Sequence, residues 1–175
     1  MINKFLSLEL GNIFFKYRGQ IPLLIIIISY PIIMQNNICM NTYLIQKIEL
    51  FSIILALIGL IIRYYVVGET PHGTSGKNRS EQVAEKLNHK GVYSISRNPL
   101  YLANFLIWIS IAMFSLSYIL LIISVVLFYF FYSNIILVEE EFLEKKFGQK
   151  YVDYKKQTPL IIPNFFKFSK TDSVF

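Results

Sequence analysis

The sequence is poor in the residues that mark metal, disulfide and nucleotide sites. Its single cysteine, Cys39, excludes an internal disulfide and has no partner at the spacing of a zinc or redox motif. The two histidines, His72 and His89, have no cysteine or carboxylate at ligand spacing, so no metal site is predicted. Thr74-Ser75-Gly76-Lys77 lacks the remaining residues of a phosphate-binding loop, and no Gly-x-Ser-x-Gly or Gly-x-Gly-x-x-Gly motif occurs.

The 41 consecutive residues 98–138 contain no charged residue. As one helix this stretch would reach about 60 Å, roughly twice the hydrocarbon core of a bilayer. We therefore expect it to fold back as a helical hairpin that turns near Ser115-Leu116-Ser117. Because a hairpin returns to the membrane surface that it left, Arg97 and Glu139 are predicted to meet there.

Hydrophobic residues make up 54% of the 175-residue chain, which indicates a polytopic membrane protein. The predicted fold is all-α, with about four transmembrane helices. The first span lies within residues 19–46, centred on Ile21–Met34 and kinked by Pro31. The second runs from about Leu50 to Val67, with Arg63 close enough to its end to reach the headgroups. The two arms of the hairpin supply the other spans.

The remaining segments complete a single predicted domain. Residues 1–18 indicate an interfacial amphipathic helix, and 19–67 hold the first two spans. Residues 68–97 form a cytosolic loop with a short helix over Ser80–Leu87, and 98–138 form the hairpin. In the cytosolic segment 139–175, the fourth helix is expected to extend to Tyr154, and Pro159 and Pro163 end the helical pattern.

The positive charges predict the orientation. Of the 17 Lys and Arg, all but Lys47 fall in the N-terminal segment, the 63–97 region or the C-terminal segment, which four spans place on one side. The positive-inside rule makes that side cytoplasmic, so both termini are predicted to be cytoplasmic, in a bacterial inner membrane. The net charge of +6 is thus interpreted as a membrane-surface property, and no nucleic-acid partner is expected.

The two ends of the hairpin carry the residues with chemical potential. Adjacent side chains of Glu139-Glu140-Glu141 point about 100° apart on a helix, so at least one is expected to face the opposite arm. That arm begins with Arg97 and Tyr101 and is preceded by Tyr93. The alternative interpretation is that the glutamates mark the water boundary and that the tyrosines are interfacial aromatics.

At these positions the chain resembles the isoprenylcysteine carboxyl methyltransferase and phospholipid methyltransferase superfamily of integral membrane enzymes. The resemblance covers residues 88–163, and the stretch from Thr74 to Asn88 looks like bacterial members. The matching residues are, in order, Gly91, Tyr93, Arg97, Pro99, Tyr101, Glu139, Glu140, Leu143, Phe147, Gly148, Tyr151, Tyr154, Pro159 and Pro163.

The resemblance implies S-adenosylmethionine as methyl donor, held in a cytosolic pocket above the hairpin. The acceptor would be a lipid or lipid-linked carboxylate, phosphate or amine arriving from the bilayer. Arg97 is assigned a catalytic role. The residues expected to contact the donor are Asn88, Tyr93, Asn98, Pro99, Leu100, Tyr101, Glu139 and Glu140.

Two departures keep other functions open. The histidine of the family motif is Asn98 here, and an amide forms hydrogen bonds but carries neither a proton nor a positive charge at neutral pH. Tyr132-Ser133-Asn134 stands where the eukaryotic enzymes have arginines, so prenylcysteine is not the favoured acceptor. The candidate receptors for an anionic headgroup are Arg63, Lys77, Arg79 and Arg97, with Lys77 and Arg79 favoured as solvated loop cations. The alternatives are an NADPH-dependent membrane lipid reductase and a non-catalytic donor-binding protein.

Overall fold

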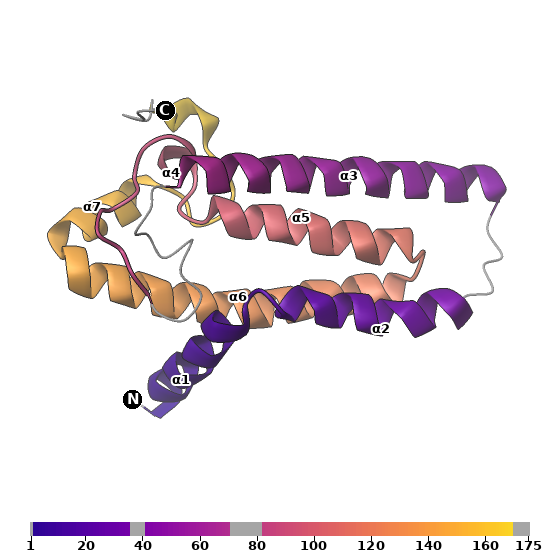
Figure 1. Ribbon diagram of the computed structural model, residues 1–175, viewed down its shortest axis with the longest axis horizontal. Helices are drawn as coiled ribbons and strands as arrows, with labels where there is room; N and C mark the ends of the chain where they lie inside the picture. Colours follow the sequence, from indigo (N-terminus) through magenta and orange to yellow (C-terminus); the bar gives the residue numbers. More distant parts are fainter. Residues whose placement is uncertain (1, 36–40, 71–81, 170–175) are drawn as a thin grey trace.

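The computed structural model describes residues 2–35, 41–70 and 82–169, which form an all-helical protein (Figure 1). No strand occurs within these ranges, where Gly91 and Ser169 make an isolated antiparallel bridge. The predicted all-α class is confirmed. The elements are α1 (Ile2–Tyr17), α2 (Ile21–Gln35), α3 (Thr42–Glu69), α4 (Val92–Ile95), α5 (Pro99–Phe114), α6 (Tyr118–Phe147), α7 (Gln149–Gln157) and the 3₁₀ turn η1 (Phe165–Lys167).

Helices α2, α3, α5 and α6 run along the long axis of the molecule (Figure 1). Helix α5 packs against α3 and α6, α2 packs against α5 and α6, and α1 packs against α6. The α5–α6 turn lies at one end of this bundle, and α4 and α7 lie at the other. The bundle therefore has one end built from a tight turn and another built from several segments distant in sequence.

Two of the described helices, α3 and α6, are long and apolar enough to cross a membrane, and α5 is a shorter apolar helix. Helix α3 extends beyond the predicted 50–67 span at both ends. It starts eight residues earlier because the Asn41 side chain caps it, accepting a hydrogen bond from the Tyr43 amide at 2.9 Å. Helix α2 covers the predicted centre of the first span and contains Pro31.

The predicted hairpin turn is confirmed. Helix α5 ends at Phe114, and α6 begins three residues beyond Ser115. Leu116 reverses the chain with a φ of 54°, a left-handed conformation that a non-glycine residue adopts only in a tight turn. The Ser117 hydroxyl then accepts the Leu120 amide at 3.3 Å and caps α6.

Small residues let the helices approach one another closely. A Cβ added at Gly59 of α3 would lie 2.9 Å from Ile107 Cγ1 and 3.0 Å from the Ala103 carbonyl oxygen of α5. A Cβ at Gly11 of α1 would lie 2.3 Å from Val138 Cγ2 of α6. Such close packing is how helices associate where lipid removes the hydrophobic driving force.

Two local predictions are wrong. The described part of the predicted 80–87 helix, from Gln82 onward, is not helical. It is too short to offset the cost of helix nucleation, and its Ala84 is instead buried, with 2% exposure. The predicted extension of α6 to Tyr154 is interrupted, because Gly148 takes a φ of 54° and starts the separate helix α7.

At the N-terminus a helix is confirmed, and Phe15 is buried in the core beside α6 residues such as Tyr132 and Ile135. Its placement at a lipid interface stays a prediction. The predictions that concern Cys39, His72 and the 74–79 stretch lie outside the described residues.

Candidate functional site

The two ends of the hairpin meet, as the sequence predicts. Arg97 Nη1 lies 2.7 Å from Glu140 Oε1, and the two side chains are only 11% and 15% exposed. The other oxygen of this carboxylate, Oε2, lies 2.8 Å from Lys155 Nζ of α7. Glu140 therefore joins the start of α5, the end of α6 and α7 through both of its oxygens.

Its neighbour Glu139 has a different partner. The Tyr101 hydroxyl donates a hydrogen bond of 2.7 Å to Glu139 Oε2, and Tyr101 is buried, with 5% exposure. Glu141 points elsewhere and pairs with Lys145 one turn along α6, at 3.1 Å. The three adjacent glutamates are thus separated by the helical period, and the water-boundary interpretation describes Glu141 alone.

Backbone contacts with the C-terminal segment hold the start of α5. The amides of Arg97 and Asn98 donate to the carbonyl oxygens of Pro159 and Leu160, at 2.9 and 3.2 Å. The Asn98 side-chain Nδ2 donates to the same Leu160 carbonyl at 3.1 Å. The Asn98 side-chain amide therefore has a defined structural contact beside the pocket.

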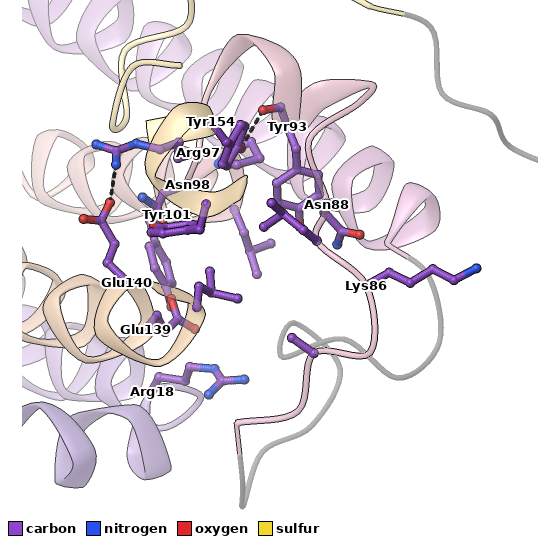
Figure 2. A pocket seen from close by; sticks show the side chains of 16 residues that line it. Arg18, Lys86, Asn88, Tyr93, Arg97, Asn98, Tyr101, Glu139, Glu140 and Tyr154 are labelled. Carbon is purple, nitrogen blue, oxygen red and sulfur yellow. Dashed lines mark hydrogen bonds and ion pairs between the residues drawn. The ribbon is translucent and has the colours of Figure 1, made fainter. Parts of the chain in front are cut away.

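A second group of contacts near the start of α5 involves tyrosines. The Tyr154 hydroxyl of α7 donates to the Tyr93 carbonyl oxygen at 2.7 Å (Figure 2). The Tyr93 hydroxyl lies 3.1 Å from Thr70 Oγ1. Burial raises the pKa of Tyr93, Tyr151 and Tyr154 above the ordinary value for tyrosine. These phenols are consequently neutral hydrogen-bonding groups at physiological pH.

Arg97, Asn98, Glu139, Glu140 and the tyrosines line one pocket, which opens to solvent. Every site residue predicted from the sequence lines it, the proposed catalytic residue included (Figure 2). The structure thus gathers the whole predicted set, drawn from the 82–98 segment, the start of α5 and the end of α6. Those residues are Asn88, Tyr93, Arg97, Asn98, Pro99, Leu100, Tyr101, Glu139 and Glu140.

Seven lining residues were not predicted as site residues. Leu143, Tyr151 and Tyr154 belong to the matched motif, so that pattern was the signal that could have found them. Arg18 reaches the pocket from the end of α1 and has no such signal, because only the packing of α1 on α6 brings it there. The others, from the segment before Tyr93, are Ala84, Lys86 and Leu87.

Metal-ligating side chains do not gather in the described ranges, where no group of three or more His, Cys, Asp or Glu has the geometry to hold an ion. The expected absence of a metal stays a prediction. The polar groups at the pocket are instead carboxylates, cations, amides and phenols, a set suited to binding an organic ligand that carries charge.

The fold and the site define a helical protein with two helices long and apolar enough to cross a membrane and a polar pocket at one end of its bundle. A family profile described as "Protein of unknown function (DUF1295)" matches residues 6–158. Since this match includes most of the chain, both ends of the hairpin and every residue that lines the pocket, the protein belongs to the DUF1295 family. No curated protein and no solved structure matches the chain.

Proposed function

We propose that the pocket binds S-adenosylmethionine and that the protein transfers its methyl group to a lipid or lipid-linked acceptor at the cytosolic membrane face. One observation carries the proposal. The residues that the methyltransferase-like motif assigns to the donor site come from separate segments, and all of them line one pocket at the end of an apolar bundle.

The lining of the pocket suits a cationic donor. Glu139 and Glu140 supply negative charge, and the ring faces of tyrosines attract cations. Both oxygens of Glu140 already pair with cations, so Glu139 is the carboxylate better placed to act on a sulfonium centre. The tyrosines that line the pocket are the buried Tyr101 and Tyr151 and the partly buried Tyr93 and Tyr154.

Arg97 offers a complementary contact. Its Nε is buried and makes no hydrogen bond to the described residues, while Nη1 is held in the ion pair with Glu140. Buried polar atoms without a protein partner are uncommon and often face a ligand or water. On this proposal Arg97 Nε donates to the carboxylate of the donor's methionine moiety, and Glu140 fixes the guanidinium for that contact.

The chemistry required of the protein is mainly alignment. S-adenosylmethionine supplies an electrophilic methyl group, which the acceptor takes while the electron pair of the broken S–C bond stays on sulfur. Holding two reactants in line is worth about 7–11 kcal/mol in favourable systems. A carboxylate or phosphate acceptor needs no general base, whereas an ammonium acceptor must first lose a proton.

The arrangement of helices supports a four-span topology, and the distribution of Lys and Arg supports the placement of both termini in the cytoplasm of a bacterial cell. Helices α2, α3, α5 and α6 lie side by side along the bundle (Figure 1). Helices α2 and α5, at 15 and 16 residues, are shorter than α3 and α6. Helix α6 continues beyond the shorter helices to carry Glu139 and Glu140 to the pocket.

A second candidate, NADPH-dependent reduction of a membrane lipid, draws on a different part of the lining. Arg18 and Lys86 join Arg97 at the pocket, and cations bind the phosphate groups of that cofactor. The ion pair of Arg97 with Glu140 removes one of these charges, which favours the sulfonium donor. A third possibility is a protein that binds the donor without turnover.

Calorimetric titration of the detergent-solubilised protein with S-adenosylmethionine, S-adenosylhomocysteine and NADPH separates these functions. The proposal expects the two adenosyl ligands to bind and NADPH not to bind; the opposite result would support the reductase. Incubation with labelled methyl donor and membrane lipid extract then tests turnover. Transfer of label into lipid establishes the enzyme, and donor binding without transfer establishes the non-catalytic alternative.

A further inference from the structure

Arg63 is a charged residue on the apolar face of a membrane-spanning helix. It lies six residues before the end of α3, about 9 Å along the helix axis, between Ile62 and Tyr64. Its side chain is exposed on the outside of the bundle. An ionisable residue inside a spanning segment is costly and commonly marks a ligand or ion pathway.

The guanidinium is held in place by a built network. Arg63 Nη1 donates to Asn104 Oδ1 of α5, and Asn104 Nδ2 donates at 3.0 Å to the Tyr132 hydroxyl of α6. Both ends of the Asn104 amide are thereby used, which fixes its orientation. The close approach of α3 and α5 at Gly59, one turn from Arg63, keeps this arginine against Asn104.

This network continues to the pocket. The Tyr132 ring lies 4.8 Å from the Tyr101 ring, centroid to centroid, and the Tyr101 hydroxyl donates to Glu139. Tyr132 and Tyr101 are both buried, with 1% and 5% exposure. A chain of polar and aromatic side chains thus connects an arginine on the lipid-facing surface with a carboxylate of the proposed donor site.

Arg63 has donors left for a ligand from the bilayer. A guanidinium carries five N–H groups, and the described residues accept a hydrogen bond from one nitrogen of Arg63. The planar array of the remaining donors matches the paired oxygens of a phosphate or carboxylate. A neutral headgroup offers no anionic oxygen to this array, and in a zwitterionic headgroup the ammonium group offsets the charge of the phosphate, so both are expected to bind more weakly.

We propose that Arg63 binds the anionic phosphate or carboxylate of the acceptor lipid's headgroup, so that the protein selects acidic lipids. Asn104 is a positioning residue that holds Arg63, and the headgroup binds to the exposed guanidinium on the outer surface of the bundle. The selection of an acidic lipid stands on the Arg63 network. Its identification with the methyl acceptor rests on the proposed function.

Native mass spectrometry of the full-length protein in detergent tests the binding step. The probes are short-chain phosphatidylglycerol, phosphatidylcholine and a fatty-acid carboxylate. The native protein should prefer phosphatidylglycerol or the carboxylate over phosphatidylcholine, and the arm that binds identifies phosphate or carboxylate as the recognised group. Arg63→Gln should lower the affinity for the acidic probe by about tenfold, which is the loss expected when a charge-assisted hydrogen bond is removed.

Matched variants keep the result interpretable. Lys47→Gln removes a charge from the other end of α3 and should leave the preference unchanged. Asn104→Ala should reduce the preference without removing the charge, and Arg63→Lys should retain part of it. If Arg63→Gln is poorly folded, the last two variants and the melting temperature decide the question. Equal weakening of acidic and zwitterionic probes, or no change in Arg63→Gln, overturns the proposal.

Donor titration of the same variants separates the two proposals. Arg63→Gln should bind S-adenosylmethionine with native affinity, because Arg63 does not line the pocket. The rate of methyl transfer to an acidic lipid should fall in this variant because the KM for the lipid rises. Failure of every variant to bind the donor refutes the methyltransferase and leaves lipid selection standing. Intact transfer kinetics in Arg63→Gln refute the role of Arg63 in acceptor binding.

Discussion

Helices α3 and α6 are alike in sequence character but differ in surroundings. Both are long, and their most apolar stretches have the same mean hydropathy, yet 17% of that stretch is buried in α3 and 33% in α6. Helix α3 packs mainly against α5, whereas α6 packs against α1, α2, α5 and α7. Composition alone does not distinguish a long apolar helix at the edge of the bundle from one that organises a site.

The difference explains where the polar residues act. On α6, contacts from several directions bury Glu139 and Glu140 among partners from α5 and α7. On α3, a single neighbouring helix leaves the Arg63 side chain exposed on the outer surface of the bundle. The better-packed helix carries the proposed donor site, and the peripheral helix carries the proposed lipid contact.

The largest expected effect concerns topology, on which the lipid-facing role of α3 depends. With Cys39 replaced by serine, a cysteine at Leu116 should react with an impermeant maleimide added to intact cells, and one at His89 should not. The four-span topology places the α5–α6 turn outside and the segment before α4 inside. The reverse pattern, or labelling at His89, would exclude this topology.

The next effect tests the α6 site directly. Glu139→Gln should weaken the binding of S-adenosylmethionine by about 1.5–3 kcal/mol, or roughly 10- to 150-fold in affinity, because a charge-assisted contact to the donor is lost. Glu141→Gln is the matched control, since Glu141 pairs with Lys145 and does not line the pocket. Calorimetry measures both; equal and negligible losses would favour the boundary interpretation of all three glutamates.

Two glycines of α3 compare its packed and open faces. Gly59→Ala should destabilise the protein by about 1–3 kcal/mol, because the new methyl group meets Ile107 and the Ala103 carbonyl. The methyl group that Gly68→Ala adds would have no atom within 4 Å. This substitution should therefore be neutral or should stabilise the protein by up to about 1 kcal/mol, since alanine favours a helix. Thermal unfolding in detergent should separate them, and similar melting temperatures would contradict close α3–α5 packing.

A smaller effect is expected at the contact between Tyr154 and Tyr93. Tyr154→Phe should cost about 0.5–1.5 kcal/mol at neutral pH, because the hydrogen bond to the Tyr93 carbonyl is lost. Burial raises the pKa of Tyr154, so its contribution to stability is complete below the unfolded pKa near 10 and is lost as pH rises above it. The variant should therefore lose less stability than the native protein above pH 10, whereas the exposed Tyr118→Phe should follow the native curve.

The smallest effect is expected at Asn98. Asn98→His should leave donor affinity within about tenfold, roughly 1.4 kcal/mol, because an imidazole can donate a hydrogen bond as the amide does. It should also create no methyl transfer that the native protein lacks. Labelled-methyl transfer into lipid extracts compares the two proteins, and transfer by the histidine variant alone would show that the native chain is not a working enzyme.

Much of the site followed from the order of charged and uncharged residues. Residues 98–138 are too long for one crossing, so the hairpin and the approach of Arg97 to the glutamates were predictable from length and charge. The path of the segment beginning at Gln82 was less predictable. Its polar residues are compatible with a short helix, but the burial of Ala84 beside the pocket stabilises a non-helical conformation more than the helical pattern stabilises a helix. Gly148 ended α6 early because a single left-handed residue redirects the chain.

The sequence by itself determined the all-α class and the turn at Ser115–Ser117, because apolar runs and their interruptions depend on local chemistry, while its resemblance to the membrane methyltransferases supplied the predicted donor-site residues that line the pocket. Only the tertiary structure decided that Arg18 reaches the pocket, that Glu140 rather than Glu139 pairs with Arg97, and that Arg63 is fixed by Asn104. These facts depend on how helices rotate and pack against one another. The hydrophobic pattern of the sequence indicates where the helices form, whereas the side-chain contacts between helices determine which residues pair with one another.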